Sequence, residues 1–210
     1  MSDLDLVPLS VFPFFSFSLP IYKKTTALFH TKKYKIPELQ RYLDEERFAD
    51  VYSAYDEEAL YLHVDARSEV GVDTNYRKGD CLELFLHTKK DDTRTFMTQF
   101  CHHLVFFPEP VDGKLVKEVT KFRTEEVHPL LTEEDLEVQS KVEPGRYFLD
   151  IAIPYAALHG FTPEKKQLRL FYRINRKTGL SQSLSMSSLE YDPQKVPHAW
   201  PEVEFISSFK

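Results

Sequence analysis

Cys101, His102 and His103 follow one another in the chain and are of the types that bind transition metals. They lie inside an apolar run that is typical of a β-strand, in which successive side chains point to opposite faces. His102 and His103 therefore cannot bind one ion from a regular strand, whereas Cys101 and His103 share a face and would need a ligand from a neighbouring strand. We predict no metal site here, and we expect Cys81 and Cys101 to be buried, reduced thiols.

The sequence contains none of the common catalytic signatures, such as a G-x-S-x-G elbow, a Walker glycine loop or an H-E-x-x-H motif. Its adjacent carboxylates, among them Glu125 with Glu126 and Glu133 with Glu134, lie in charged stretches that are typical of solvated loops. A glycosidase needs two carboxylates at a defined separation, which a sequence does not show. We therefore predict a protein that is not an enzyme.

Two segments alternate cleanly between apolar and other residues, which is typical of β-strands. At 59–65, Leu60, Leu62 and Val64 share one face, and at 81–87 every second residue is leucine. The same reasoning predicts further strands, separated by short turns, at residues 51–55, 96–107, 117–124, 136–142, 146–154, 168–175, 184–188 and 203–209.

Helix is nearly absent from this pattern. Residues 37–43 look like one short helix, because Pro37 suits a first turn, and residues 154–158 look like a single turn. Roughly ten strands with so little helix predict an all-β fold, an antiparallel β-sandwich of jelly-roll type with one or two short helices.

The chain, residues 1–210, is expected to form a single domain, since this length can bury a core without metal or disulfides. Its first part, residues 1–30, is Phe-rich and broken by prolines, so we expect an arm or an edge strand there, and the sandwich at 31–210. The aromatic residues of this arm are Phe12, Phe14, Phe15 and Phe17.

The composition supports a strand-rich core and limits the partners. The chain has 17 Phe and 11 Tyr, and its net charge of −6 offers no basic stripe for nucleic acid or anionic membranes. It has no run of 18 apolar residues, and Asp3 and Asp5 stand where a secretory signal carries positive charge. We expect a cytoplasmic protein that binds neither nucleic acid nor membranes.

Four segments resemble, in order, the family 9 carbohydrate-binding modules and the wider DOMON-like group. They are DEEALYL at 56–62, GDCLELFL at 79–86, YFLDIAIP at 147–154 and LFYRIN at 170–175. They match the signatures D-x-x-x-L-Y, D-x-x-E-x-F, Y-x-x-x-x-x-I-P and a late F-x-x-x-x-N-like strand. Their order is more specific than any one of them alone. The resemblance implies an antiparallel β-sandwich that binds carbohydrate without catalysis.

Sugar-binding members of that family hold the sugar end between two tryptophans, while polar side chains bind the hydroxyls. Aromatic faces cover the apolar side of a sugar ring, and polar groups replace the water around its hydroxyls. By resemblance, Glu83 matches the family glutamate, Arg173 falls at a polar site position, and Asn175 follows on the same strand face. The two tryptophans are missing, and Tyr76 and Tyr191 are the nearest aromatic residues.

These residues also have ordinary structural interpretations. Glu83 and Arg173 can form a cross-strand salt bridge on a solvated face. Asn175 can serve the turn at 176–179, because Asn tolerates left-handed backbone. Trp200, the single tryptophan, is assigned to core or loop packing.

The resemblance also raises the question of cofactors, and we predict none. Structural calcium is the alternative, but the acids at 56–58 and at Asp91 and Asp92 lack the spacing of a calcium loop and suit turns. Haem is not expected, because no C-x-x-C-H motif occurs. Candidates for haem by residue type alone are Met97, Met186, His63 and His103.

Two functions stay open. The leading hypothesis is a non-catalytic domain that binds a sugar or glycan end at Tyr76, Glu83, Arg173, Asn175 and Tyr191. The alternative is a cytoplasmic interaction protein that has kept the fold and lost sugar binding, with the Phe-rich arm at 11–17 contacting a protein partner. The missing tryptophans favour the alternative, and the retained polar residues favour the leading hypothesis. If the site exists, its three polar side chains must converge on one sheet face.

Overall fold

The computed structural model describes residues 17–26, 29–89, 95–187 and 190–207, and in them eleven strands form one sheet. The all-β prediction is confirmed, and the predicted strands at 81–87 and 146–154 have the bounds observed. The strands are β1 (Ser18–Lys23), β2 (Ala49–Tyr55), β3 (Ala59–Ala66), β4 (Cys81–His87), β5 (Cys101–Val111), β6 (Lys114–Glu118), β7 (Glu137–Glu143), β8 (Arg146–Pro154), β9 (Arg169–Asn175), β10 (Ser181–Ser183) and β11 (Glu202–Ile206).

The described residues contain only short 3₁₀ helices, so the predicted helices at 37–43 and 154–158 are each reduced to one three-residue turn. The turns are η2 (Lys32–Tyr34), η3 (Gln40–Tyr42), η4 (Tyr76–Lys78), η5 (Glu133–Asp135), η6 (Tyr155–Ala157), η7 (Pro193–Lys195) and η8 (Pro197–Ala199). No helix in these described parts is long and apolar enough to cross a membrane.

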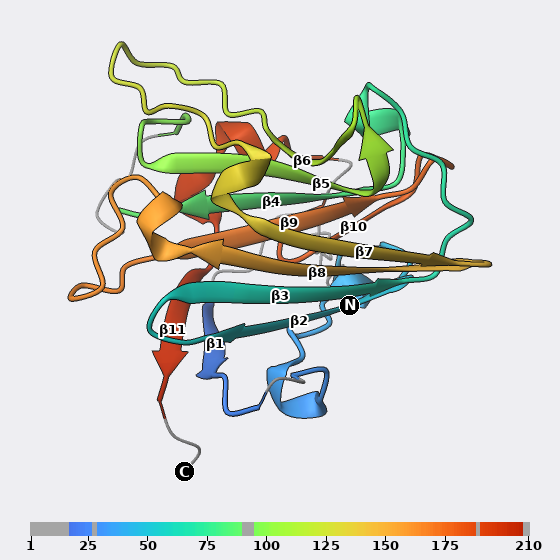
Figure 1. Cartoon of the computed structure of the whole chain (residues 1–210), viewed down its shortest axis with the longest axis horizontal. Helices are drawn as coiled ribbons and strands as arrows, with labels where there is room; N and C mark the ends of the chain where they lie inside the picture. Colours follow the sequence, from blue (N-terminus) through green and yellow to red (C-terminus); the bar gives the residue numbers. More distant parts are fainter. Residues whose placement is uncertain (1–16, 27–28, 90–94, 188–189, 208–210) are drawn as a thin grey trace, which may run out of the picture.

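The strands follow the order β6-β5-β4-β9-β11-β1-β2-β3-β8-β7, with β10 beside β9, and the sheet curls round like a barrel (Figure 1). The two ends of this order lie close together, since β7 contacts both β6 and the adjacent β5. Ser140 on β7 donates a hydrogen bond to the backbone carbonyl of Pro108 on β5. The sheet is mixed rather than purely antiparallel as predicted, since β1 runs parallel to both β11 and β2.

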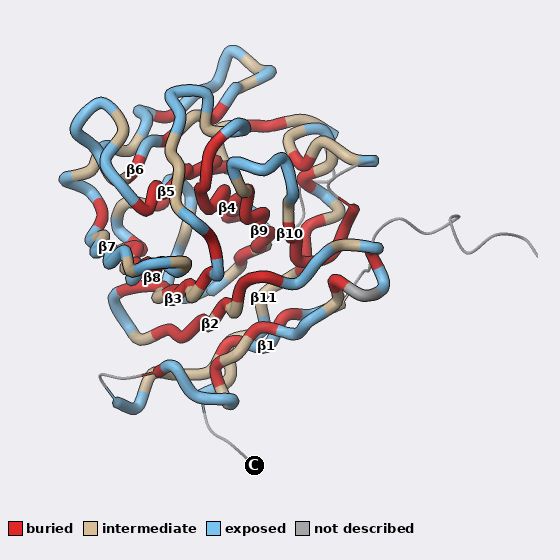
Figure 2. Tube along the Cα trace, turned by 90° about the vertical axis from the view of Figure 1, so that its right-hand side faces the viewer, coloured by how far each residue is buried: buried red, intermediate tan, exposed pale blue. Residues whose placement is uncertain are grey.

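The inner face of the curled sheet holds the main core. The row of Leu82, Leu84 and Leu86 on β4 packs in one apolar cluster with alternate residues of β3, β8 and β9, all fully buried. Strand β4 is buried on its outer face as well, as the tube of Figure 2 shows. The segment at residues 190–200, the covering segment, lies over this outer face. The ring centroid of its Trp200 lies 5.4 Å from that of Phe85 on β4.

Three of the predicted strands are displaced from the observed ones, and the strand predicted at 203–209 is β11, which ends at Ile206. The predicted strand at 117–124 lies instead at β6, because Asp112 and Gly113 both have positive φ and close a tight hairpin with β5. Asp-Gly is a strong signal for such a turn. The predicted strand at 96–107 begins only at Cys101. Residues 184–187 form no strand, and β10, which pairs with β9, lies just before them.

Of the Phe-rich cluster at 11–17, only Phe17 lies within the described residues, and it packs against the main core. The strand that follows it, β1, is an interior strand between β11 and β2, not an edge strand. Its Leu19 and Ile21 are buried, so β1 joins the two halves of the sheet through both backbone pairing and core packing.

Cys81 and Cys101 are both free and buried, as predicted. Their places in the sheet keep them apart, because Cys101 pairs with His87 at the opposite end of β4 from Cys81. At about 3.3 Å per residue this separation is about 20 Å, well beyond the reach of a disulfide.

Replacing Ile21 by alanine should lower the free energy of unfolding by about 2–5 kcal/mol, because it removes a buried side chain that joins β1 to the core. Urea denaturation measures this loss. The control is Leu180→Ala, whose side chain is 44% exposed and which should cost far less. Equal losses in the two variants would contradict the role of β1.

Candidate functional site

Glu83, Arg173 and Asn175 lie together on the outer face of β4 and β9. The antiparallel register places Glu83 opposite Arg173, and Asn175 one pair further along the same face. Oε1 of Glu83 lies 2.8 Å from Nε of Arg173 and accepts a hydrogen bond from Nδ2 of Asn175 at 2.7 Å. The sheet therefore brings together the three polar residues that the resemblance singled out.

A fourth residue, His103 on β5, completes this group. Its Nε2 lies 2.9 Å from Oε2 of Glu83, and its Nδ1 lies 3.2 Å from the amide nitrogen of Gln194 in the covering segment. Because that amide donates to Nδ1, the imidazole carries its proton on Nε2 and donates it to Glu83. Burial lowers the pKa of His103, which agrees with a neutral ring.

His103 was not predicted as a member of this group, although the sequence contains a signal for it. Cys101 and His103 share a strand face, and the register pairs His103 with Phe85, the neighbour of Glu83 on that face. Nothing in the sequence fixes this register. His102 points to the opposite face and contacts Glu118 at 3.1 Å, so the predicted separation of the two histidines is confirmed.

The carboxyl of Glu83 is fully buried and ionised. Burial alone would raise its pKa, but the hydrogen bond from His103, the charge of Arg173 and the hydrogen bond from Asn175 outweigh that and lower the pKa to about 2. The cross-strand salt bridge expected as the ordinary interpretation is therefore present. Its face is covered rather than solvated.

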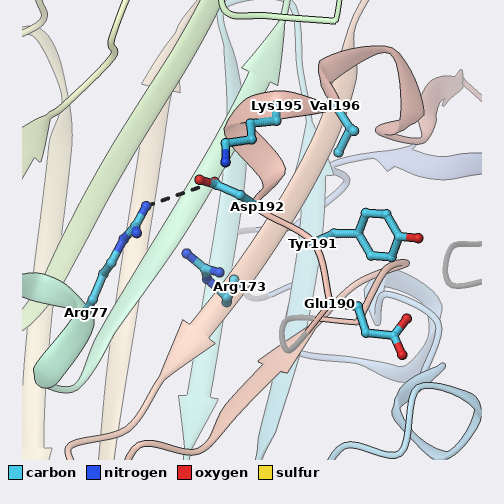
Figure 3. Close-up of a pocket in the computed structure, with 7 residues that line it drawn as sticks. All are labelled: Arg77, Arg173, Glu190, Tyr191, Asp192, Lys195 and Val196. Atoms are coloured by element: carbon cyan, nitrogen blue, oxygen red, sulfur yellow. Dashed lines mark ion pairs between the residues drawn. The ribbon is translucent and has the colours of Figure 1, made fainter.

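Only Arg173 of this group reaches open space. It borders a pocket of about 540 Å³ between η4 and the covering segment (Figure 3). Arg77 on η4 lies across from Asp192, with 4.0 Å between Nη2 and Oδ1. The pocket is lined by Arg77, Arg173, Glu190, Tyr191, Asp192, Lys195 and Val196.

The two predicted rim tyrosines do not face each other across this pocket. Tyr191 lines it, but Figure 3 shows its ring directed away from Arg173. Tyr76 borders a neighbouring pocket of about 310 Å³ and packs edge-on against His103, with 5.9 Å between ring centroids. Trp200 is 1% exposed and packs in the core, so its assignment to packing is confirmed.

The acids considered for calcium behave as turn residues where they are described. Oδ1 of Asp56 accepts hydrogen bonds from the backbone N–H groups of Glu58 and Ala59, both at 2.9 Å. Asp91 and Asp92 lie outside the described residues. Met97 and Met186 are both buried within the main core cluster.

Comparison with known proteins finds similarity in structure only. No family model and no curated protein matches the sequence. A family 9 carbohydrate-binding module from Caldicellulosiruptor kristjanssonii in complex with cellotriose superimposes with a TM-score of 0.60 at 10% identity, over 92% of this chain and 95% of that one. The chain has the fold of this family.

Two further solved structures agree with that fold. A family 9 module from Caldicellulosiruptor kristjanssonii in complex with glucose matches at 11% identity with a TM-score of 0.59, over 91% of this chain and 97% of that chain. A protein of Bacteroides uniformis ATCC 8492 that is proposed to bind carbohydrate matches at 16% identity with a TM-score of 0.56, over 91% of this chain and 100% of that chain.

Replacing Glu83 by glutamine should lower the free energy of unfolding at pH 7 by about 3–5 kcal/mol, because it leaves the Arg173 charge without its buried partner. The pH dependence should change too. The pKa of Glu83 is lowered to about 2 in the folded protein, so its contribution is complete above the ordinary value of 4.5 and is lost as the pH falls towards 2.

Urea denaturation between pH 7 and pH 2 measures both effects. The wild type should lose stability over this range more steeply than Glu83→Gln. Glu58→Gln, at an exposed position, serves as the control and should follow the wild type. Parallel pH profiles for wild type and Glu83→Gln would show that Glu83 is not the buried anion described above.

Proposed function

We propose that the protein is a non-catalytic carbohydrate-binding domain that holds a sugar or the end of a glycan in the pocket beside Arg173. One observation carries the proposal. An arginine fixed by a fully buried carboxylate borders an open pocket, on a fold shared with modules crystallised with cellotriose and glucose. The remaining support is the chemistry of the pocket.

Arg173 is suited to binding hydroxyl groups. Its Nε and Nη2 both contact Glu83, at 2.8 and 2.7 Å, which leaves the Nη1 donors for another acceptor. A planar guanidinium held in one orientation loses little entropy when it donates hydrogen bonds to a ligand. Glu83 and Asn175 therefore act as positioning residues, not as groups that touch the sugar.

The rest of the pocket supplies both donors and acceptors. Arg77 and Lys195 donate, and Asp192 and Glu190 accept, which is the mixture that a ring of hydroxyls requires. The volume of about 540 Å³ falls within the range of about 300–1,000 Å³ that small-molecule sites occupy. Because Tyr191 turns away from Arg173, we expect binding that depends more on hydrogen bonds than on stacking.

One observation favours the alternative of an interaction protein. The single tryptophan is buried, and the two candidate tyrosines border separate pockets, so these three residues form no facing pair that could cover a sugar ring. In that case the fold would serve a protein partner, and the arm at 11–17 stays the predicted contact surface.

Arg77→Gln tests the sugar proposal better than a change at Glu83, whose loss would destabilise the fold. The side chain of Arg77 is 49% exposed, so the variant should fold normally. Losing a charged hydrogen-bond donor should weaken binding roughly 10- to 100-fold. A glycan array identifies the ligand, and titration calorimetry with glucose and cellotriose measures the affinity.

The matched control is Arg146→Gln, since Arg146 is 47% exposed and is also paired with an aspartate, on β8 away from the pocket. It should bind as the wild type does. The absence of any glycan ligand for the wild type would favour the interaction protein. Equal binding by Arg77→Gln and the control would remove the pocket from consideration.

A further inference from the structure

A second group of polar side chains lies on the outer face of β3 and β8, apart from the pocket. The antiparallel register places His63 on β3 directly opposite Asp150 on β8. The segment that follows β1 folds over this face, and its Phe29 and Tyr34 pack with Ala54 of β2. This segment carries His30 above His63.

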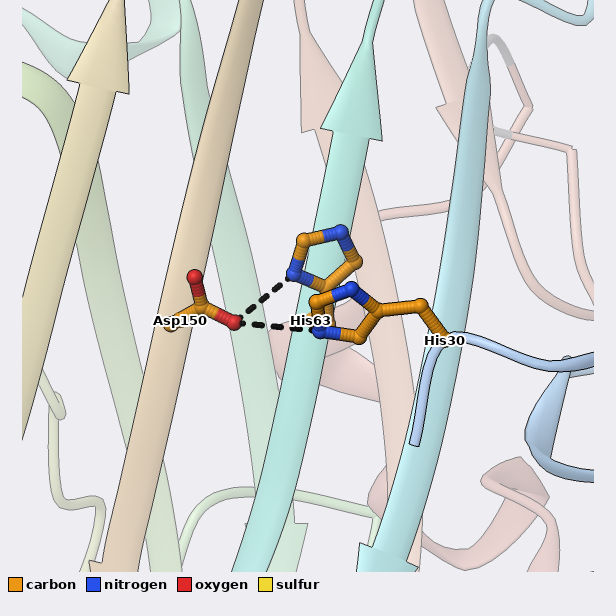
Figure 4. Close-up of side chains that lie close together, drawn as sticks. All are labelled: His30, His63 and Asp150. Atoms are coloured by element: carbon orange, nitrogen blue, oxygen red, sulfur yellow. Dashed lines mark hydrogen bonds and ion pairs between the residues drawn. The ribbon is translucent and has the colours of Figure 1, made fainter. Parts of the chain in front are cut away.

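The donor atoms of these residues converge on one point, as Figure 4 shows. Oδ1 of Asp150 lies 2.8 Å from Nδ1 of His63 and 3.5 Å from Nε2 of His30. The two imidazole rings stack with 3.5 Å between centroids and 18° between planes. An ion bound in the plane of the His63 ring therefore requires the partly exposed His30 ring to turn towards it about its side-chain bonds. All three donor atoms lie within 4.8 Å of one another.

We propose that His30, His63 and Asp150 bind a first-row divalent transition-metal ion, with Zn²⁺ as the representative ion. Donor atoms bound at about 2.0–2.1 Å to one zinc ion, with angles of roughly 90–120° between the bonds, lie about 2.9–3.6 Å apart. The observed separations of 2.8 and 3.5 Å between the nitrogens and the carboxylate oxygen match that range closely. Two imidazoles and one carboxylate are a donor set that suits zinc.

The surroundings fix His63 and leave one side of the site open. His63 is 5% exposed and lies between the rings of Tyr52 and Phe148, with centroids 5.8 and 6.1 Å away. The side chain of Asp150 is 49% exposed, so the ion can reach the site and take its remaining ligands from water. The site is thus partly preformed on a rigid sheet.

The other compact group of this kind in the described residues, His102 with Glu118 and His128, is less suited to a metal. Nε2 of His102 accepts a hydrogen bond from the backbone N–H of His159 at 3.1 Å. The ring therefore carries its proton on Nδ1, the atom that faces Glu118 at 3.1 Å. Both ring nitrogens of His102 are therefore occupied, and no lone pair of this ring is left for an ion.

A metal ion at the proposed site would join the segment before β2 to β3 and β8. Because the unfolded chain does not hold these ligands together, binding should stabilise the folded state. Calorimetric titration of the untagged full-length protein with ZnCl₂ should show one ion per chain, and the melting temperature should rise with Zn²⁺ concentration. With Cu²⁺, electron paramagnetic resonance should show coupling to two nitrogens.

His30→Ala is the decisive variant, because the side chain of His30 is 35% exposed and its removal leaves the core intact. Both His30→Ala and His63→Ala should weaken Zn²⁺ binding about tenfold or more and reduce the thermal shift. The matched control is His198→Gln, at an exposed histidine on η8, which should bind as the wild type does. No Zn²⁺ binding by the wild type, or unchanged binding in His30→Ala, would overturn the proposal.

Discussion

The buried carboxylate of Glu83 constrains this structure more than any other group. An ionised carboxyl at 0% exposure is tolerated only when it is paired and hydrogen-bonded, and here Arg173, Asn175 and His103 provide the partners. Those partners come from β9 and β5, so β4 must lie between them in one register. The covering segment completes the arrangement, since Gln194 fixes the imidazole that contacts Glu83.

The sheet has an inner face that packs the core and an outer face that two chain segments cover. The covering segment lies over β4 and β5, and the segment after β1 lies over β2 and β3. Polar side chains lie at the margin of both segments. Beside the covering segment they line the pocket at Arg173, and beside the segment after β1 they are His30, His63 and Asp150. Loops laid on a rigid scaffold are where binding sites usually form.

The fold is that of the family 9 carbohydrate-binding modules, while two aromatic residues near the polar group of Glu83 serve packing in this chain. Tyr76 takes part in packing against His103, and Trp200 packs against Phe85. The polar group of Glu83, Arg173, Asn175 and His103 serves the stability of the sheet, because its hydrogen bonds join β4, β5 and β9. The fold alone therefore does not determine a ligand, because function depends on the residues of the site.

Period-two alternation in the sequence was sufficient to predict the strands at 81–87 and 146–154, the leucine row and the shared face of Arg173 and Asn175. The depth of burial of Glu83 was not predictable, because it depends on the covering segment, which lies more than a hundred residues away in the chain. The same holds for His103, whose contact requires the β4–β5 register. His30 meets His63 and Asp150 only through the path of a loop, and local patterns do not encode such a path. Alternation is a local property of the backbone, whereas register and coverage are set by packing between distant segments.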